Sequence, residues 1–139
     1  MPTMNFTRRD FDSMDINSGI DLLTYGLPIK IITKKAWKTP KTKIFFICED
    51  DVTLLQWVSV NKTLQKNTIE LKTVTHISEN PTSVKSKVYQ NCDPTLLLSI
   101  HHGKSDELVL LFNDVGTKMS WWFGLQYFIE DAQNEEKDL

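Results

Sequence analysis

A group of lysines surrounds a tryptophan in the first third of the chain. Between residues 30 and 43 there are six lysines and no acidic residue, with Trp37 in the middle. Ammonium groups bind phosphate as point charges, and each lysine near an anionic bilayer contributes roughly 1 kcal/mol within a Debye length. We therefore expect weak, reversible and salt-sensitive binding to anionic phospholipid; the alternative is a solvated surface loop. The lysines are Lys30, Lys34, Lys35, Lys38, Lys41 and Lys43.

Trp37 has two interpretations. Its neighbours Lys35, Lys38 and Pro40 show neither strand nor helix periodicity, and an indole between lysines suits the headgroup layer, where the ring and its N–H are both satisfied. Most tryptophans are largely buried, so Trp37 packed beneath the loop is the alternative to membrane insertion. Trp57 and Trp121 stand in regular apolar patterns, and we expect both in the core.

The charge of the chain is unevenly distributed. The net charge is −2 and the pI about 5.9, which argues against a general nucleic-acid binder. Residues 1–43 carry a net +4, however, and the remaining 96 residues carry a net −6. One face can therefore meet an anion although the whole protein is acidic. Single-strand binders interleave several stacking aromatics, and Trp37 alone occurs among these lysines, so we expect no nucleic-acid partner.

The remaining residues with chemical potential form no recognisable catalytic or metal pattern. His101 and His102 are adjacent on an expected strand, so their rings point to opposite faces and do not chelate one metal. Even when His76, Cys48 and Cys92 are considered with these two histidines, their spacing along the chain matches no recognisable metal-ligand pattern. The sequence shows no glycine-rich phosphate loop, nucleophile elbow or paired helical carboxylates. We expect no metal, no cofactor and no enzymatic activity.

Cysteine content and hydropathy indicate a cytoplasmic protein. Two cysteines are no disulfide framework, the start resembles no signal peptide, and no apolar run approaches the roughly 18 residues of a membrane span. The opening "MPTM" has no glycine at position 2, so no myristoylation signal is visible. A truncated start would hide such a signal, which leaves acylation of the native N-terminus open.

The elements that position these residues are mostly short strands. Residues 1–18 are polar and predict a tail or a short helix. Six or seven β-rich runs follow, which favours an antiparallel sandwich or barrel. The acidic turn 49–51 and Gly103 are expected to close hairpins, and the polar segment 78–94 to form a loop, with one short strand around Val88 and Tyr89 as an option. The expected strands are 20–26 (with 29–33 as its continuation or an insertion), 43–50, 53–60, 67–74, 95–102 and 107–114.

The end of the chain changes period. Trp121, Leu125, Phe128 and Ile129 fall at i, i+4, i+7 and i+8, which predicts an amphipathic helix. Asn113 or Asp114 is placed to cap it. Residues 132–139 are expected to form a charged tail. Strands first and one helix last predict a small mainly-β domain whose open end is closed by a helix.

Three segments resemble parts of the pleckstrin-homology (PH) domain, and they occur along the chain in the same order as in that domain. "WWFGLQYFI" resembles the end of its helix, where Trp121 precedes the Gly124-Leu125 pair. "TLLQW", ending at Trp57, and "SGIDLLTYG" resemble the third and first strands of the phospholipase-C-like subgroup. The resemblance covers residues 19–131 and implies a seven-stranded antiparallel barrel or sandwich capped by one C-terminal α-helix.

The resemblance also implies a binding site. The family holds lipid phosphates with a basic-x-basic-apolar-aromatic pattern on its second strand, which Lys41-Thr-Lys43-Ile-Phe45 matches. Lys62 stands in the loop after the third strand, and Trp37 stands where phospholipase C delta has a loop tryptophan. If the first strand ends at Gly26, Thr24 and Gly26 replace its usual lysines. Lysine lacks the fork of arginine, which favours phosphatidic acid over one particular inositol phosphate.

The resemblance further implies membrane recruitment in signalling. The composition is similar to that of acylated PH-domain proteins of apicomplexan parasites, which bind phosphatidic acid. We expect a monomeric, peripheral membrane protein that binds an anionic phospholipid, either phosphatidic acid or a phosphoinositide. The alternative is a protein-interaction scaffold on the same fold without lipid specificity, which the acidic body favours.

Overall fold

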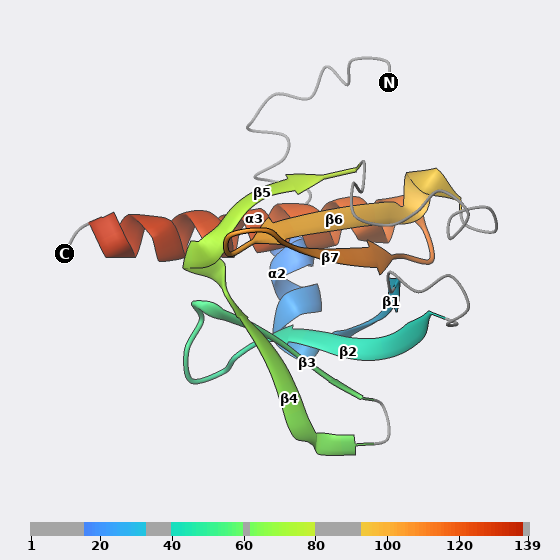
Figure 1. The fold of residues 1–139 in the computed structure, drawn as a ribbon, viewed down its shortest axis with the longest axis horizontal. Helices are drawn as coiled ribbons and strands as arrows, with labels where there is room; N and C mark the ends of the chain where they lie inside the picture. The colour runs from blue at the N-terminus through green and yellow to red at the C-terminus, as the bar shows by residue number, and fades with distance from the viewer. Residues whose placement is uncertain (1–15, 33–39, 60–61, 80–92, 138–139) are drawn as a thin grey trace.

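The described residues fold into one antiparallel sheet with two α-helices (Figure 1). The computed structural model describes residues 16–32, 40–59, 62–79 and 93–137. Within them the sheet has seven strands in the order β4-β3-β2-β1-β7-β6-β5. The elements are α2 (Ile16–Tyr25), β1 (Leu27–Ile32), β2 (Lys41–Ile47), β3 (Leu54–Ser59), β4 (Lys62–Glu70), η1 (Leu71–Thr73), β5 (Val74–Ser78), η3 (Pro94–Leu96), β6 (Leu97–His102), β7 (Asp106–Leu111) and α3 (Val115–Lys137).

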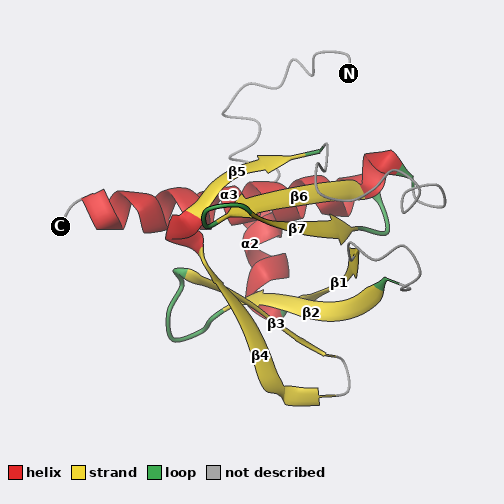
Figure 2. Ribbon diagram, in the orientation of Figure 1, coloured by secondary structure: helices red, strands yellow, loops and turns green. Residues whose placement is uncertain are grey.

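Strand β1 joins the two halves of the sheet. Its residues Leu27–Ile31 pair with β2, and Lys30–Ile32 pair with β7. Pro28 lies where β1 pairs with β2 only, so its missing N–H interrupts no bond to β7. Strands β4 and β5 form the two ends of the sheet, and α3 runs along the half made of β5, β6 and β7 (Figure 2). The predicted mainly-β fold with a C-terminal helix is confirmed.

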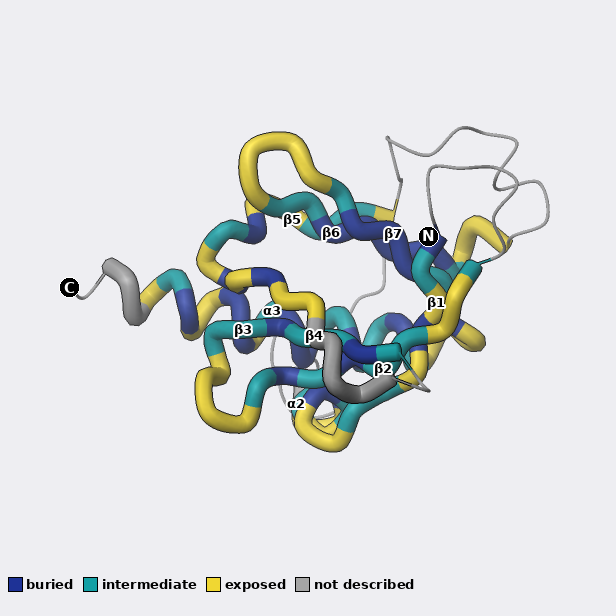
Figure 3. The backbone as a smooth tube through the Cα atoms, turned by 60° about the horizontal axis from the view of Figure 1, so that its bottom comes forward, coloured by how far each residue is buried: buried dark blue, intermediate teal, exposed yellow. Residues whose placement is uncertain are grey.

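The core lies between the sheet and α3. Trp121 is fully buried, with Phe45 at a ring-centroid distance of 6.3 Å and Phe112 at 5.4 Å. Truncation of such a residue typically costs about 3–5 kcal/mol. Trp57 is half-buried and stacks on Phe45 at 5.2 Å. The expectation that both tryptophans belong to the core is confirmed for Trp121, while Trp57 packs against the core's edge. Figure 3 marks the buried segments along the strands and α3.

The predicted first strand is wrong. Residues 20–26, expected to be extended, belong to helix α2 and its terminal Gly26. Gly26 has φ = 94° and donates its N–H to the Leu22 carbonyl at 3.0 Å, a helix end that favours glycine. Gly19 and Leu23, one turn apart, are buried, which gives the segment a helical face. The first strand is instead β1, Leu27–Ile32, which falls on the segment expected to continue or interrupt it.

Two further boundaries differ from expectation. The run 67–74 is not one strand, because β4 ends at Glu70 and η1 separates it from β5. Helix α3 continues to Lys137, so most of the expected tail is helical. The predicted apolar stripe of the C-terminal helix is confirmed, because its four residues are buried in α3. The two predicted hairpins, β2–β3 and β6–β7, are also confirmed, and Gly103 in the second has φ = 63°. Residues 80–92, with Val88 and Tyr89, lie outside the described residues.

Neither described helix has the length and apolar character needed to cross a membrane.

Candidate functional site

Lys41 and Lys43 share one face of β2. Side chains alternate along a strand, so the two lysines lie on the same face as Phe45 and Ile47, which are buried in the core. Lys41 is exposed and Lys43 is half-buried. The lysines therefore extend the core-facing side of the sheet outward, at the end of β2 that follows the β1–β2 connection. We call Lys41 and Lys43 the lysine edge.

A neighbouring strand positions Lys43. It lies directly opposite Ser59 of β3, and its Nζ donates a hydrogen bond to the Ser59 hydroxyl at 2.7 Å. Because a lysine stem loses much conformational freedom when it is fixed, this bond holds the ammonium in place before any ligand arrives. On the other side of Ser59, the backbone of Lys62 pairs from β4. The side chain of Lys62 lies outside the described residues.

No carboxylate in the described part of the chain neutralises the lysine edge. The salt bridges found there join Lys72 to Glu70, His101 to Glu107 and Lys118 to Glu79. No salt bridge between described residues involves Lys30, Lys41 or Lys43. Positive groups without a counter-charge are available to an anion.

The first strand contributes apolar residues to this face. Ile31 lies opposite Lys41, and Ile29 lies opposite Lys43. Lys30 lies opposite Thr42, so it faces the other side of the sheet. The structure therefore separates Lys30 from the lysine edge. Thr24 and Gly26 do not occupy first-strand positions, because Thr24 is on α2 and bonds the Ile20 carbonyl at 2.7 Å; Ile29 and Ile31 hold those positions.

Four predicted site residues lie outside the described residues. They are Lys34, Lys35, Lys38 and Trp37, all between the end of β1 and the start of β2. Both interpretations of Trp37 stay predictions. The described residues that flank them are Ile32, at the end of β1, and Pro40, before the start of β2.

A polar network on β5, β6 and β7 was missed by the sequence reasoning. The Ser99 hydroxyl donates to Glu107 and lies 3.2 Å from His101 Nε2, which is 3.4 Å from Glu107 Oε2. The ring of His76 stacks on that of His101 at 3.9 Å. Ser99 is fully buried, and both it and Glu107 approach the same imidazole nitrogen. Nucleophilic catalysis needs the acid on the other nitrogen, so we interpret this as a structural network.

Metal binding finds no support among the described residues. No group of three or more histidine, cysteine, aspartate or glutamate side chains is arranged to hold an ion within residues 16–32, 40–59, 62–79 and 93–137. Cys48 is a free, half-buried thiol.

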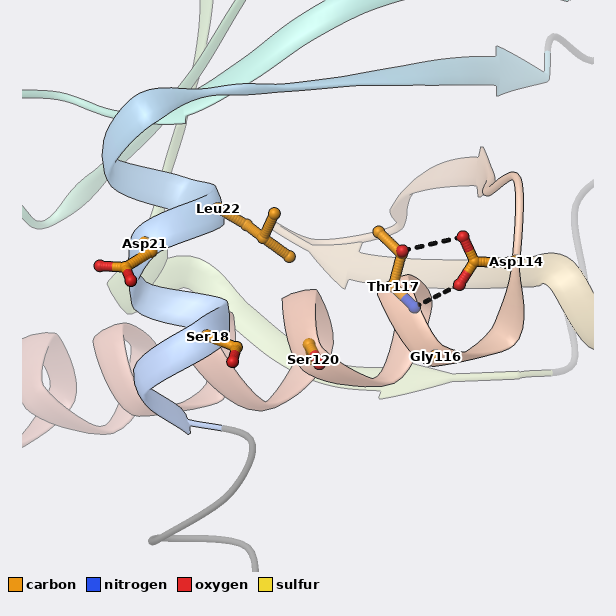
Figure 4. A pocket seen from close by; sticks show the side chains of 7 residues that line it. All are labelled: Ser18, Asp21, Leu22, Asp114, Gly116, Thr117 and Ser120. Carbon is orange, nitrogen blue, oxygen red and sulfur yellow. Dashed lines mark hydrogen bonds between the residues drawn. The ribbon is translucent and has the colours of Figure 1, made fainter.

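A shallow depression of about 500 Å³ lies between α2 and the start of α3 (Figure 4). Its hydroxyl groups come from Ser18, Thr117 and Ser120. The Asp114 carboxylate accepts bonds from the Thr117 N–H at 2.7 Å and the Thr117 hydroxyl at 2.9 Å. These bonds lower the pKa of Asp114, and they confirm it as the predicted cap. With Asp21 as its other charged residue and no basic lining residue, this depression is unsuited to phosphate.

Comparison with known proteins identifies the fold. No family model matches the chain, and no curated protein matches it. Among solved structures, Inner Membrane Complex sub-compartment protein 1 from Toxoplasma gondii aligns with a TM-score of 0.67 at 15% identity, covering 94% of this chain and 98% of that one. Sub-compartment protein 3 from the same organism aligns with a TM-score of 0.61 at 8% identity, with 86% of each chain covered.

Two solved PH domains align as well. The PH domain from TgAPH gives a TM-score of 0.59 at 15% identity, covering 89% of this chain and 96% of that one. The PH domain from PfAPH gives a TM-score of 0.56 at 17% identity, covering 92% of this chain and 99% of that one. The chain therefore has the PH fold that the sequence motifs predicted.

Proposed function

We propose that this PH-fold chain is a membrane-recruitment module that binds anionic phospholipid headgroups at the lysine edge. The observation that carries the proposal is the placement of Lys41 and Lys43 on one face of β2, with Lys43 held by Ser59 at 2.7 Å and no described carboxylate paired with either. Lys34, Lys35, Lys38 and Lys62 would add charge at the same end, and Trp37 would insert into the headgroup layer.

The chemistry favours a simple phosphate over a particular inositol phosphate. Two lysines two residues apart on a strand stand about 7 Å from each other, which suits two oxygens of neighbouring phosphates or one exposed phosphomonoester. Lysine supplies no bidentate fork, and Ile29 and Ile31 supply no charge from β1. We therefore propose phosphatidic acid, or charge-dependent phosphoinositide binding without stereospecificity, as the ligand class.

Binding of this kind is weak. At roughly 1 kcal/mol per lysine, the described pair contributes about 2 kcal/mol, and stable anchoring requires a second signal such as an acyl chain. We propose that the protein acts as a peripheral protein on the cytoplasmic side of a membrane, where anionic lipid is concentrated. An N-terminal acyl group on the native protein would complete the anchor.

Vesicle co-sedimentation tests the proposal. The full chain is mixed with phosphatidylcholine vesicles, alone or with about 20% phosphatidic acid or a phosphoinositide, at low and moderate salt. We expect binding to both anionic vesicles, little binding to neutral ones, and a loss as salt increases. Equal binding to neutral and anionic vesicles would refute the proposed function.

A protein-interaction scaffold is the second candidate function. The observation in its favour is the apolar pair Ile29 and Ile31, which stand on β1 opposite the two lysines. A PH-fold site with lysines on one strand only attracts anionic lipid less strongly than a site with basic residues on two strands. Binding to a protein partner that persists in the Lys41→Glu/Lys43→Glu variant would favour this function.

A further inference from the structure

We propose that a groove at the far end of β2 from the lysine edge binds a cationic segment of a partner protein through an aromatic or aliphatic anchor residue. The groove has a volume of about 390 Å³. Its apolar lining comes from three elements and one turn: Tyr25 at the end of α2, Ile47 at the end of β2, Val52 in the β2–β3 turn and Phe128 on α3. We call it the Tyr25 groove.

Two of the four apolar residues that line the Tyr25 groove are exposed to water, whereas Ile47 (6%) and Phe128 (9%) are buried. Tyr25 is 84% exposed and Val52 is 44% exposed. They are two of the four large apolar side chains in the described residues that are exposed to this degree, the others being Val115 and Tyr127. Exposed apolar side chains that gather around a hollow, rather than being scattered singly, mark interaction sites. The volume lies toward the lower end of the roughly 300–1,000 Å³ range of pockets that bind small ligands.

The charge around the groove defines the chemistry of the partner. Glu49 is part of the lining, and Asp50 and Asp51 follow it in the same turn. Asp51 accepts bonds from the Thr53 N–H at 3.0 Å and from its hydroxyl at 2.5 Å, which lower its pKa and keep it ionised. Lys72, whose charge also lowers the pKa of Asp51, lies 3.9 Å from Glu70. This one lysine faces four carboxylates (Glu49, Asp50, Asp51 and Glu70), so acidic residues are in excess here. An apolar hollow with an acidic rim favours lysine or arginine beside the anchor.

The position of the groove allows simultaneous binding to a membrane. Lys41 begins β2 and Ile47 ends it, and six steps at about 3.3 Å place the two ends about 20 Å apart. The acidic rim repels anionic lipid, whereas the lysine edge attracts it. A chain bound to a membrane by its lysine edge therefore keeps the Tyr25 groove away from the bilayer and open to a partner.

A synthetic peptide tests this proposal. The probe is a fluorescent peptide of about twelve residues, with two phenylalanines spaced among lysines, titrated into the full chain by anisotropy. Two matched peptides carry glutamate in place of lysine, or alanine in place of phenylalanine. We expect the first probe to bind and each matched peptide to bind at least about tenfold more weakly, since both charge and anchor are needed.

Matched variants of the protein locate the binding. Val52→Lys places a charge in the Tyr25 groove, whereas Val115→Lys changes an equally exposed valine (46% against 44%) at the start of α3. We expect Val52→Lys to weaken peptide binding at least about tenfold and Val115→Lys to leave it unchanged. Equal effects of the two variants, or equal binding of the alanine peptide, would overturn the proposal. Dimerisation of the chain that Val52→Lys abolishes would also overturn it, because a second copy would then occupy the groove.

Discussion

Gly19 of α2 and Gly124 of α3 meet backbone to backbone. A Cβ placed on Gly124 would lie 2.4 Å from the Gly19 carbonyl carbon, and a Cβ on Gly19 would lie 2.0 Å from the Ser120 oxygen. Real Cβ atoms do not approach so closely, so the contact requires glycine at both positions. Since β1 begins two residues after α2 ends, this helix crossing also sets where the first strand of the sheet starts.

Gly124→Ala is expected to destabilise the protein. The added methyl group forces the helices apart, and overpacking of this kind typically costs about 1–3 kcal/mol. For a chain of this length we expect the thermal midpoint to decrease by roughly 3–12 °C. Gly116→Ala on the same helix is the control, because its Cβ would meet nothing closer than an Asp114 oxygen at 3.4 Å. A midpoint for Gly124→Ala equal to that of the control would contradict the described crossing.

Glu79→Gln is expected to cost more stability than Lys118→Met. Lys118 is 1% exposed, and its Nζ donates to Glu79 at 2.8 Å and to the Thr95 carbonyl at 2.6 Å. Removing the carboxylate leaves a buried ammonium with a neutral partner, whereas Lys118→Met removes the charge itself. Because Glu79 is 51% exposed and water screens it, we expect only about 1–2 kcal/mol for Glu79→Gln.

Urea unfolding of the two variants measures this difference. We expect Lys118→Met to fall within about 1 kcal/mol of the wild type, since buried ion pairs are often replaceable by apolar side chains. A larger loss for Lys118→Met than for Glu79→Gln would show that the buried charge itself contributes net stability.

Asp114→Asn is expected to flatten the acid dependence of stability. The bonds from Thr117 lower the pKa of Asp114 below 3.8 in the folded chain. Stability from this carboxylate is therefore present above its unfolded pKa and is lost as the pH falls through the folded pKa. Asparagine caps helices well but does not titrate, so unfolding midpoints of the variant should decrease less between about pH 5 and pH 2. Identical acid slopes would show that the carboxylate contributes nothing through its charge.

The sheet could be predicted from the sequence because its strands carry strong local signals. The runs ending at Ile47, Ser59 and Leu111 have the β-branched and apolar content of strands, and Gly103 marks a hairpin. Helix α2 could not be recognised by the same signals, because a run as short as 20–25 fits a buried helix or a strand equally. Gly26 after that run was the one local indication of a helix end.

The lysine edge could be predicted in part. Lys41 and Lys43 are two residues apart, and the strand period alone places them on one face. The position of Lys30 depends on the register between β1 and β2, which pairs it with Thr42 and which no local pattern reveals. The Ser59 partner of Lys43 likewise depends on strand pairing. The Tyr25 groove is built from three segments distant in sequence (24–25, 47–52 and Phe128), so it becomes visible only in the folded chain.

Charge reversal at the lysine edge tests the central claim most directly. Lys41→Glu/Lys43→Glu is compared with Lys72→Glu/Lys104→Glu, which changes the net charge equally through exposed lysines on η1 and in the β6–β7 turn. Co-sedimentation with phosphatidic-acid vesicles is measured after the unfolding midpoints show that both variants are folded. We predict at least about a thirtyfold loss of affinity for the first variant, from roughly 1 kcal/mol per lysine, and a much smaller loss for the second. Equal losses in the two variants, or no loss in the first, would contradict membrane binding at the lysine edge.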